Sequence, residues 1–168
     1  LYGCSPGWKK DYIDRETLGK ILQKIKSLGC NSIHVGGGEP FLNLDGLKMV
    51  VEVVRSQRVH LEYVETNSSW FNGRGSAIEI LSSLKESGLS TVLISMSPFH
   101  NEHIPFYRVK GVIEACKETG INIFPWISEF YPEIDAFDDR ATHSLSEYEE
   151  KYGVNYLSRI PSRYWIHF

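Results

Sequence analysis

The sequence predicts an α/β fold, a partial (β/α) barrel of parallel strands with outer helices. Helical and strand patterns alternate along the chain with a period of about 30 residues, the length of one βα unit. Glycines stand at three helix-to-strand joins, Gly29, Gly88 and Gly120, where a left-handed residue turns the chain back. The 168 residues are 42% hydrophobic and 23% charged, which suits one domain with its own core. A doubly wound sheet is the alternative arrangement.

The expected elements follow one another in a regular order. Asp14 can cap a first helix that ends at Gly29, because the apolar residues between them have helical spacing. Apolar stripes predict three further helices, over 44–54, 77–84 and 109–116. The four expected strands are "NSIHVG", "VHLEYVETN", "STVLISMS" and "INIFPWIS", at 31–36, 59–67, 90–97 and 121–128.

The pattern weakens after the fourth strand. Residues 128–143 are acidic, and we expect them to form a loop. Ser144 and Glu147 have the spacing of a capping box, which predicts a helix that pauses at Gly153. "RYWIHF", 163–168, alternates like the start of another strand. The chain has no initiator Met and ends within this pattern, so we expect residues 1–168 to be a single domain truncated at both ends.

Charge and composition favour a cytoplasmic protein. The net charge of −3 leaves no broad basic surface for nucleic acid, and no apolar run approaches the about 20 residues of a membrane span. The N-terminus lacks the order of a signal peptide. The three cysteines are odd in number and widely spread, which fits reduced thiols. Cys30 and Cys116 have apolar neighbours and are expected to be packing residues.

Three consecutive glycines follow the first predicted strand, in "HVGGGEPFL", His34 to Leu42. A phosphate-binding P-loop would need Lys and Ser or Thr after the glycines, and a dinucleotide fingerprint would need a glycine where Phe41 stands. The bare backbone and Glu39 offer acceptors, which suit a ligand with a positive amino group, and Pro40 fixes the exit of the loop. Two other interpretations of this motif are a flexible turn and a carboxylate that caps the next helix.

The motif "GGEP", Gly37 to Pro40, resembles the signature loop of the radical S-adenosylmethionine (SAM) enzymes. "ETNS", Glu65 to Ser68, is similar to the Thr-Asn-Gly strand end of that family, with Ser68 where glycine is usual. "LISMS", Leu93 to Ser97, is similar to the next strand end, where a serine often meets the ribose. These motifs fall in the family's order along most of the chain.

The resemblance implies an enzyme that cleaves SAM with an electron from a 4Fe–4S cluster and releases a 5′-deoxyadenosyl radical for hydrogen abstraction from a substrate. It also implies a small-molecule or peptide substrate and an electron donor such as ferredoxin or flavodoxin, with no nucleic acid and no membrane as partner. By position, the cofactor-binding residues would be Gly37, Gly38, Glu39, Pro40, Thr66, Asn67, Ser95 and Trp126. The first three would hold the amino group of SAM, the next polar residues its carboxylate or ribose, and Trp126 or Ile127 would lie near the adenine.

One family motif is missing from the chain. The cluster is held by Cys-x3-Cys-x2-Cys, and the residues around Cys4 do not fit this spacing. We therefore expect the cluster cysteines upstream of Leu1, no metal ligand within the chain, and no radical activity of the chain on its own.

Other functions compete with this interpretation. Glu39, Glu65, His100 and Glu129 follow strand ends, where a divalent-metal isomerase or hydrolase would place its ligands. His100 and His103 have a spacing that can share a metal, although two surface histidines are the simpler alternative. Arg108 could reach a carboxylate, but a solvated arginine is more common. A barrel that serves as a non-catalytic interaction module is a further alternative.

Overall fold

Four parallel strands form one sheet in the computed structural model, which describes residues 12–158 and 160 but not the side chains of Pro125 and Trp126. The strands are β1 (Ser32–Val35), β2 (His60–Thr66), β3 (Thr91–Ser95) and β4 (Asn122–Trp126), and they lie in the order β1-β2-β3-β4. Each neighbouring pair is parallel. A doubly wound sheet would reverse its strand order, and the described strands do not. The α/β prediction of a partial (β/α) barrel is therefore confirmed.

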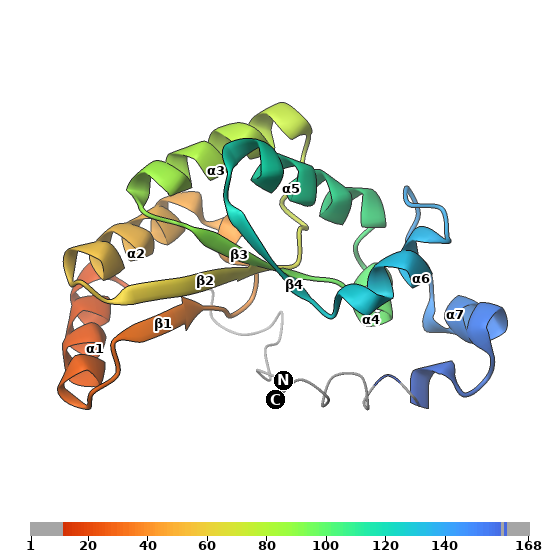
Figure 1. Cartoon of the computed structure of the whole chain (residues 1–168), viewed down its shortest axis with the longest axis horizontal. Helices are drawn as coiled ribbons and strands as arrows, with labels where there is room; N and C mark the ends of the chain where they lie inside the picture. Colours follow the sequence, from red (N-terminus) through yellow and green to blue (C-terminus); the bar gives the residue numbers. More distant parts are fainter. Residues whose placement is uncertain (1–11, 159, 161–168) are drawn as a thin grey trace.

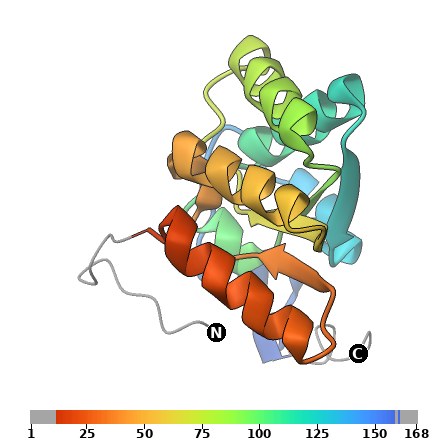
Figure 2. The same cartoon turned by 90° about the vertical axis from the view of Figure 1, so that its left-hand side faces the viewer.

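The helices α2, α3 and α5 cover one face of this sheet (Figure 1). In the view of Figure 2, α1, α2 and α3 follow one another in a row on the same side. The α-helices are α1 (Arg15–Ser27), α2 (Leu44–Ser56), α3 (Arg74–Ser87), α4 (Pro98–Asn101), α5 (Phe106–Thr119), α6 (Tyr131–Asp135) and α7 (Leu145–Tyr152). Two 3-10 helices, η1 (Pro40–Leu42) and η2 (Ser128–Phe130), follow β1 and β4. None of the described helices is long and apolar enough to cross a membrane.

The core lies between the sheet and its helices. Leu22 of α1, Val64 of β2, Leu81 of α3 and Ile94 of β3 have no exposed surface. Buried residues of α1 lie four apart, at Leu18 and Leu22, as the sequence predicts. In β3 the consecutive residues 92–94 are all buried, as is usual for a parallel strand covered on both faces. Burial of this apolar surface is what fixes the helices against the sheet.

The predicted helix caps are confirmed. The Asp14 carboxylate accepts a hydrogen bond from the Thr17 backbone N–H at 2.8 Å. Ser144 and Glu147 form both bonds of a capping box at the start of α7, and this helix ends at Tyr152, before Gly153.

Two predictions need correction. The segment 128–143 is only partly a loop, because it contains η2 and α6; Phe130 and Ile134, four residues apart, are buried and anchor these turns in the core. Cys30 is exposed, because it lies in the turn between α1 and β1, whereas Cys116 is buried as predicted. Burial raises the pKa of the Cys116 thiol to about 12. The strand predicted at 163–168 lies outside the described residues.

Candidate functional site

The loop after β1 is joined to the end of β2 by the carboxylate of Glu39. Its Oε2 accepts a hydrogen bond from the backbone N–H of Asn67 at 2.6 Å, and the Thr66 hydroxyl lies 3.0 Å from both carboxylate oxygens. Oε1 also accepts from the backbone N–H of Phe41 at 3.1 Å, so Glu39 caps η1. Glu39 thus caps the short η1 and not the predicted apolar helix, α2, whose cap is Asn43. The Glu39 carboxylate also joins the ends of two strands.

The Thr66 side chain fixes the orientation of the Glu39 carboxylate. Thr66 is 2% exposed, and its hydroxyl accepts hydrogen bonds from the Ser68 backbone N–H at 3.0 Å and the Trp70 Nε1–H at 2.8 Å. Donation to Glu39 uses its only proton. The Thr66 hydroxyl is thus fully bonded within the protein, and its structural role is to orient Glu39.

Trp70 and Phe41 complete the support and were not predicted from the sequence. Their rings stack with centroids 4.6 Å apart and planes 7° apart, and Phe41 is buried. The only sequence signal was an aromatic residue shortly after each of the two motifs. Trp70 donates a hydrogen bond to Thr66 and packs on Phe41, so it holds the loop after β2 against η1.

The glycines before Glu39 expose their backbone. Gly36, Gly37 and Gly38 are all exposed, and Gly37 has a φ of 126°, a conformation that favours glycine. A Cβ at Gly36 would come within 2.9 Å of Glu65 Oε2, whereas a Cβ at Gly37 or Gly38 would meet nothing within 4 Å. The loop therefore leaves open space directly before a fixed carboxylate.

Burial raises the pKa of Glu39 above its ordinary value. The hydrogen bonds from Asn67, Phe41 and Thr66 act in the opposite direction, because they favour the ionised form. A bound cationic group would add to that stabilisation of the carboxylate. Among the described residues, no cationic side chain forms a salt bridge with this carboxylate.

The other predicted residues reach the same edge of the sheet. Ser95 ends β3 and is paired in register with Trp126 of β4, whose side chain lies outside the described part of the structure. The amide oxygen of Asn67 accepts from the Ser69 backbone N–H at 2.9 Å. Ser68 is fully buried, has a φ of 67°, and its Oγ has no hydrogen-bond partner among the described residues.

The structure does not assemble the alternative metal site. Within the described residues, no group of three or more His, Cys, Asp or Glu side chains could hold a metal ion. This contradicts the hypothesis built on Glu39, Glu65, His100 and Glu129. His100 Nδ1 instead lies 2.8 Å from the buried Ser97 hydroxyl. Burial, with the nearby His103, lowers the pKa of His100.

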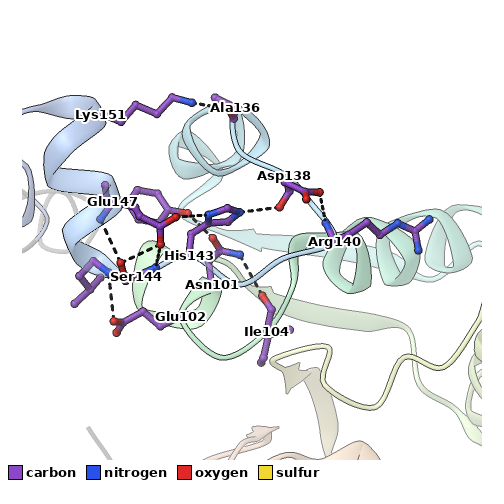
Figure 3. Close-up of polar contacts among 12 residues, drawn as sticks. Asn101, Glu102, Ile104, Ala136, Asp138, Arg140, His143, Ser144, Glu147 and Lys151 are labelled. Atoms are coloured by element: carbon purple, nitrogen blue, oxygen red, sulfur yellow. Dashed lines mark hydrogen bonds and ion pairs between the residues drawn. The ribbon is translucent and has the colours of Figure 1, made fainter.

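A second polar cluster joins α4 to α7 and was missed by the sequence analysis (Figure 3). His143 Nδ1 lies 3.0 Å from Glu147 Oε1, and its Nε2 lies 2.8 Å from the Asp138 carbonyl. The backbone N–H of His143 donates to the Asn101 carbonyl, and the Tyr148 hydroxyl donates to the Asn101 side chain at 2.7 Å. These hydrogen bonds hold the segment after α6 against α4, the helix that follows β3.

Arg108 is also bound within the protein rather than solvated. Its Nη1 donates to the Ser69 carbonyl, which ties α5 to the loop after β2. The prediction of a solvated arginine is therefore wrong.

Comparison with known proteins identifies the family of the chain. The sequence model of the Radical SAM superfamily matches residues 3–128, more than half of the chain. A probable GTP 3′,8-cyclase from Methanococcus maripaludis is 26% identical over 103 residues, which cover 61% of this chain. The aligned part is 32% of that relative, so the chain spans about a third of its length. No solved structure matches the chain.

Proposed function

From the premise that this chain belongs to the radical SAM superfamily, we propose that it is the cofactor-binding core of an enzyme that reductively cleaves SAM with a 4Fe–4S cluster. Together, the two cofactors supply a 5′-deoxyadenosyl radical that abstracts hydrogen from the substrate. A ferredoxin or flavodoxin would provide the electron. From the cyclase relative we carry over the enzyme class alone.

The observation that carries the proposal is the fixed carboxylate of Glu39 beside open glycine backbone. An ammonium group in this space would meet one charged acceptor that is already oriented by Thr66 and the Asn67 N–H. It would also meet the carbonyls exposed by Gly37 and Gly38, whose Cβ positions are empty. These residues fit the amino end of SAM.

The remaining contacts follow from the position of the strand ends. Asn67 and Ser95 are proposed to contact the carboxylate or the ribose, because both are partly exposed at the carboxyl edge of the sheet. Trp126 is proposed to lie near the adenine. Pro40 begins η1 and fixes the direction in which the chain leaves the loop.

The described residues do not fit the cluster. Cys30 is exposed beside β1 and Cys116 is buried in α5, and neither belongs to a group that could hold a metal. Cys4 lies outside the described residues. We therefore propose that the cluster cysteines precede Leu1 in the full-length protein and that the chain alone is inactive.

Titration calorimetry with SAM tests the binding site directly. Gly38→Ala should fold normally, since its Cβ meets nothing within 4 Å, yet it would fill the space that the ligand needs. Glu39→Gln should weaken SAM binding about ten-fold, because it removes a charge-assisted acceptor. The matched controls are Gly19→Ala in α1, where a Cβ meets nothing within 4 Å, and Glu79→Gln at an exposed position of α3. Equal affinity in all four variants would refute the assignment of Glu39 and Gly38.

The activity is tested on the full-length protein. After anaerobic reconstitution and reduction, SAM should yield 5′-deoxyadenosine, and Glu39→Gln should reduce its formation. The 168-residue chain treated in the same way should show no stable 4Fe–4S spectrum. Such a spectrum from the chain alone would disprove the proposed position of the cysteines.

A further inference from the structure

A shallow cavity of about 420 Å³, open to solvent, lies on the helix side of the fold, between the loop after β2, the start of α5 and the segment after α6. It contains Asn72, Arg74, Tyr107, Lys110, Asp139 and Arg140 in its wall. None of these residues belongs to the proposed SAM site. Its volume is in the range of small-molecule sites.

Three cations, Arg74, Lys110 and Arg140, and one carboxylate, Asp139, lie in the wall of the cavity. Two further carboxylates pair with these cations from beside the wall, Glu118 with Arg74 and Asp135 with Lys110, so the opposite charges of the region nearly balance. Lys110 is engaged with acidic side chains, since its Nζ lies 2.5 Å from Asp135 and 2.8 Å from Asp139. It contributes charge and holds Asp139 in place.

The two arginines keep most of their donors free. Arg74 uses Nε for Glu118, at 2.6 Å, which leaves both Nη groups without a partner in the described part of the chain. The Arg140 guanidinium lies 4.7 Å from the centre of the Tyr107 ring and 3.9 Å from Asp139 Oδ1. That side chain makes no hydrogen bond to any described residue, and in Figure 3 it extends away from the His143–Glu147 cluster.

The Arg140 guanidinium lies over the Tyr107 ring, and its edge makes no hydrogen bond to a described residue. A guanidinium edge matches two oxygens of a phosphate group, and Arg74 in the same wall adds further donors. The Asn72 amide lies in the same wall. The unused N–H groups of the two arginines and the Asn72 amide are therefore the donors that an anion in this cavity could use.

We propose that this cavity binds a phosphate-bearing small molecule, with Arg74 and Arg140 as the phosphate ligands and Lys110 as a supporting charge. The proposal is independent of SAM binding, because the two sites share no residue. The competing explanation is an ion-pair network that only braces residues 135–140 against α5, and the experiment below distinguishes the two.

Inorganic phosphate and pyrophosphate are the probes, titrated into the protein at constant ionic strength with chloride and acetate as reference anions. We expect either phosphate to bind more tightly than both reference anions. Arg74→Gln and Arg140→Gln should each weaken phosphate binding about ten-fold, as expected for loss of a charge-assisted contact. Their side chains are 71% and 77% exposed, so both variants should fold.

Lys24→Gln on α1, another exposed cation, is the control and should bind phosphate as the wild type does. If neither phosphate nor pyrophosphate binds better than chloride at a concentration of about 10 mM, the proposal is overturned, because even a weak specific site would bind measurably there. Undiminished phosphate binding by the Arg74→Gln/Arg140→Gln double variant would overturn it as well.

Discussion

The Thr66 hydroxyl lies 3.0 Å from both carboxylate oxygens of Glu39, so the end of β2 orients the acidic group of the loop after β1. The same hydroxyl accepts from Ser68 and Trp70. One buried side chain thus connects the β2 loop with the predicted ligand-binding carboxylate. Its removal should affect stability as well as binding.

Thr66→Val should lower the free energy of unfolding by about 3 kcal/mol, because it keeps the shape but leaves two buried N–H groups without an acceptor. Urea unfolding measures the change. Thr91→Val in β3 is the control, since its hydroxyl makes only a long contact of 3.5 Å with Ser90, and we expect a change within about 0.5 kcal/mol. Equal effects of the two substitutions would show that the Thr66 network adds no stability.

Gly111 is the point where α5 meets the loop after β2. A Cβ there would come within 2.2 Å of the Phe71 ring, which is buried. Gly111→Ala should therefore destabilise the protein by about 2 kcal/mol through overpacking. Gly19→Ala, where a Cβ meets nothing within 4 Å, should instead stabilise helix α1 by about 0.5–1 kcal/mol.

A second substitution checks the cause of this effect. Phe71→Leu removes part of the ring, so the cost of Gly111→Ala should be smaller in that background. Additive costs in thermal or urea unfolding would mean that the two residues are not in contact in the way the structure describes.

Local sequence patterns predicted the fold well, but they do not predict contacts between segments that are distant in the sequence. The strands, the long helices and the caps at Asp14 and Ser144 follow from spacing and from residues three apart. The bonds that fix Glu39 join residues 27 and 28 positions away, and no local pattern encodes them. Helix α6 was missed because its acidic residues masked the apolar pair Phe130 and Ile134, which tertiary packing buries.

The same reasoning explains the predicted site. Motif order brought Glu39 together with Thr66 and Asn67, which the structure confirms, because parallel strands end at one edge of the sheet. It could not reveal that Thr66 uses its whole bonding capacity within the protein. A direct contact of Thr66 with SAM stays a prediction, and the structure shows the Thr66 hydroxyl bonded to Glu39 instead.

His143 predicts a pH dependence of stability. Burial of its ring lowers its pKa, but the Asp138 carbonyl and the Glu147 carboxylate together raise it above the ordinary value of 6.5. The doubly protonated ring is therefore favoured in the folded state. This stabilisation is complete below pH 6.5 and is lost as the pH rises through the raised pKa.

The contribution of Glu147 to stability depends on pH in the opposite direction. The hydrogen bond to His143, followed by those of the Ser144 cap, lowers the pKa of Glu147 to about 2. Its contribution is complete above pH 4.5 and is lost as the pH falls toward the lowered pKa. The pair should therefore stabilise the protein most between about pH 4.5 and 6.5.

Urea unfolding at pH 5.5 and pH 8 measures the His143 effect. The wild type should lose stability at the higher pH, and His143→Gln should lose less between the two values. Glu147→Gln, which keeps the charge of His143 but removes its anionic partner, should reduce the pH dependence as well. An unchanged pH profile in both variants would contradict this explanation.

Ser68 combines a left-handed φ of 67°, complete burial and an Oγ without a hydrogen-bond partner among the described residues. Each of these features disfavours serine there, and glycine adopts that conformation without the steric cost of a Cβ. Ser68→Gly should therefore raise the free energy of unfolding by about 1 kcal/mol. Ser69→Gly, at the next residue with no positive φ, should be destabilising, since it adds only backbone freedom.

SAM titration of the same variant separates strain from a binding role. If the Ser68 hydroxyl contacts the cofactor, Ser68→Gly should be more stable than the wild type yet bind SAM more weakly. A strained backbone conformation persists at a binding site when the side chain that it positions contacts the ligand. A gain in stability with unchanged affinity would assign Ser68 no contact with SAM. A loss of stability in Ser68→Gly would mean that the Ser68 hydroxyl makes a stabilising hydrogen bond within the folded protein. That bond, and not contact with a ligand, would then explain the positive φ of Ser68.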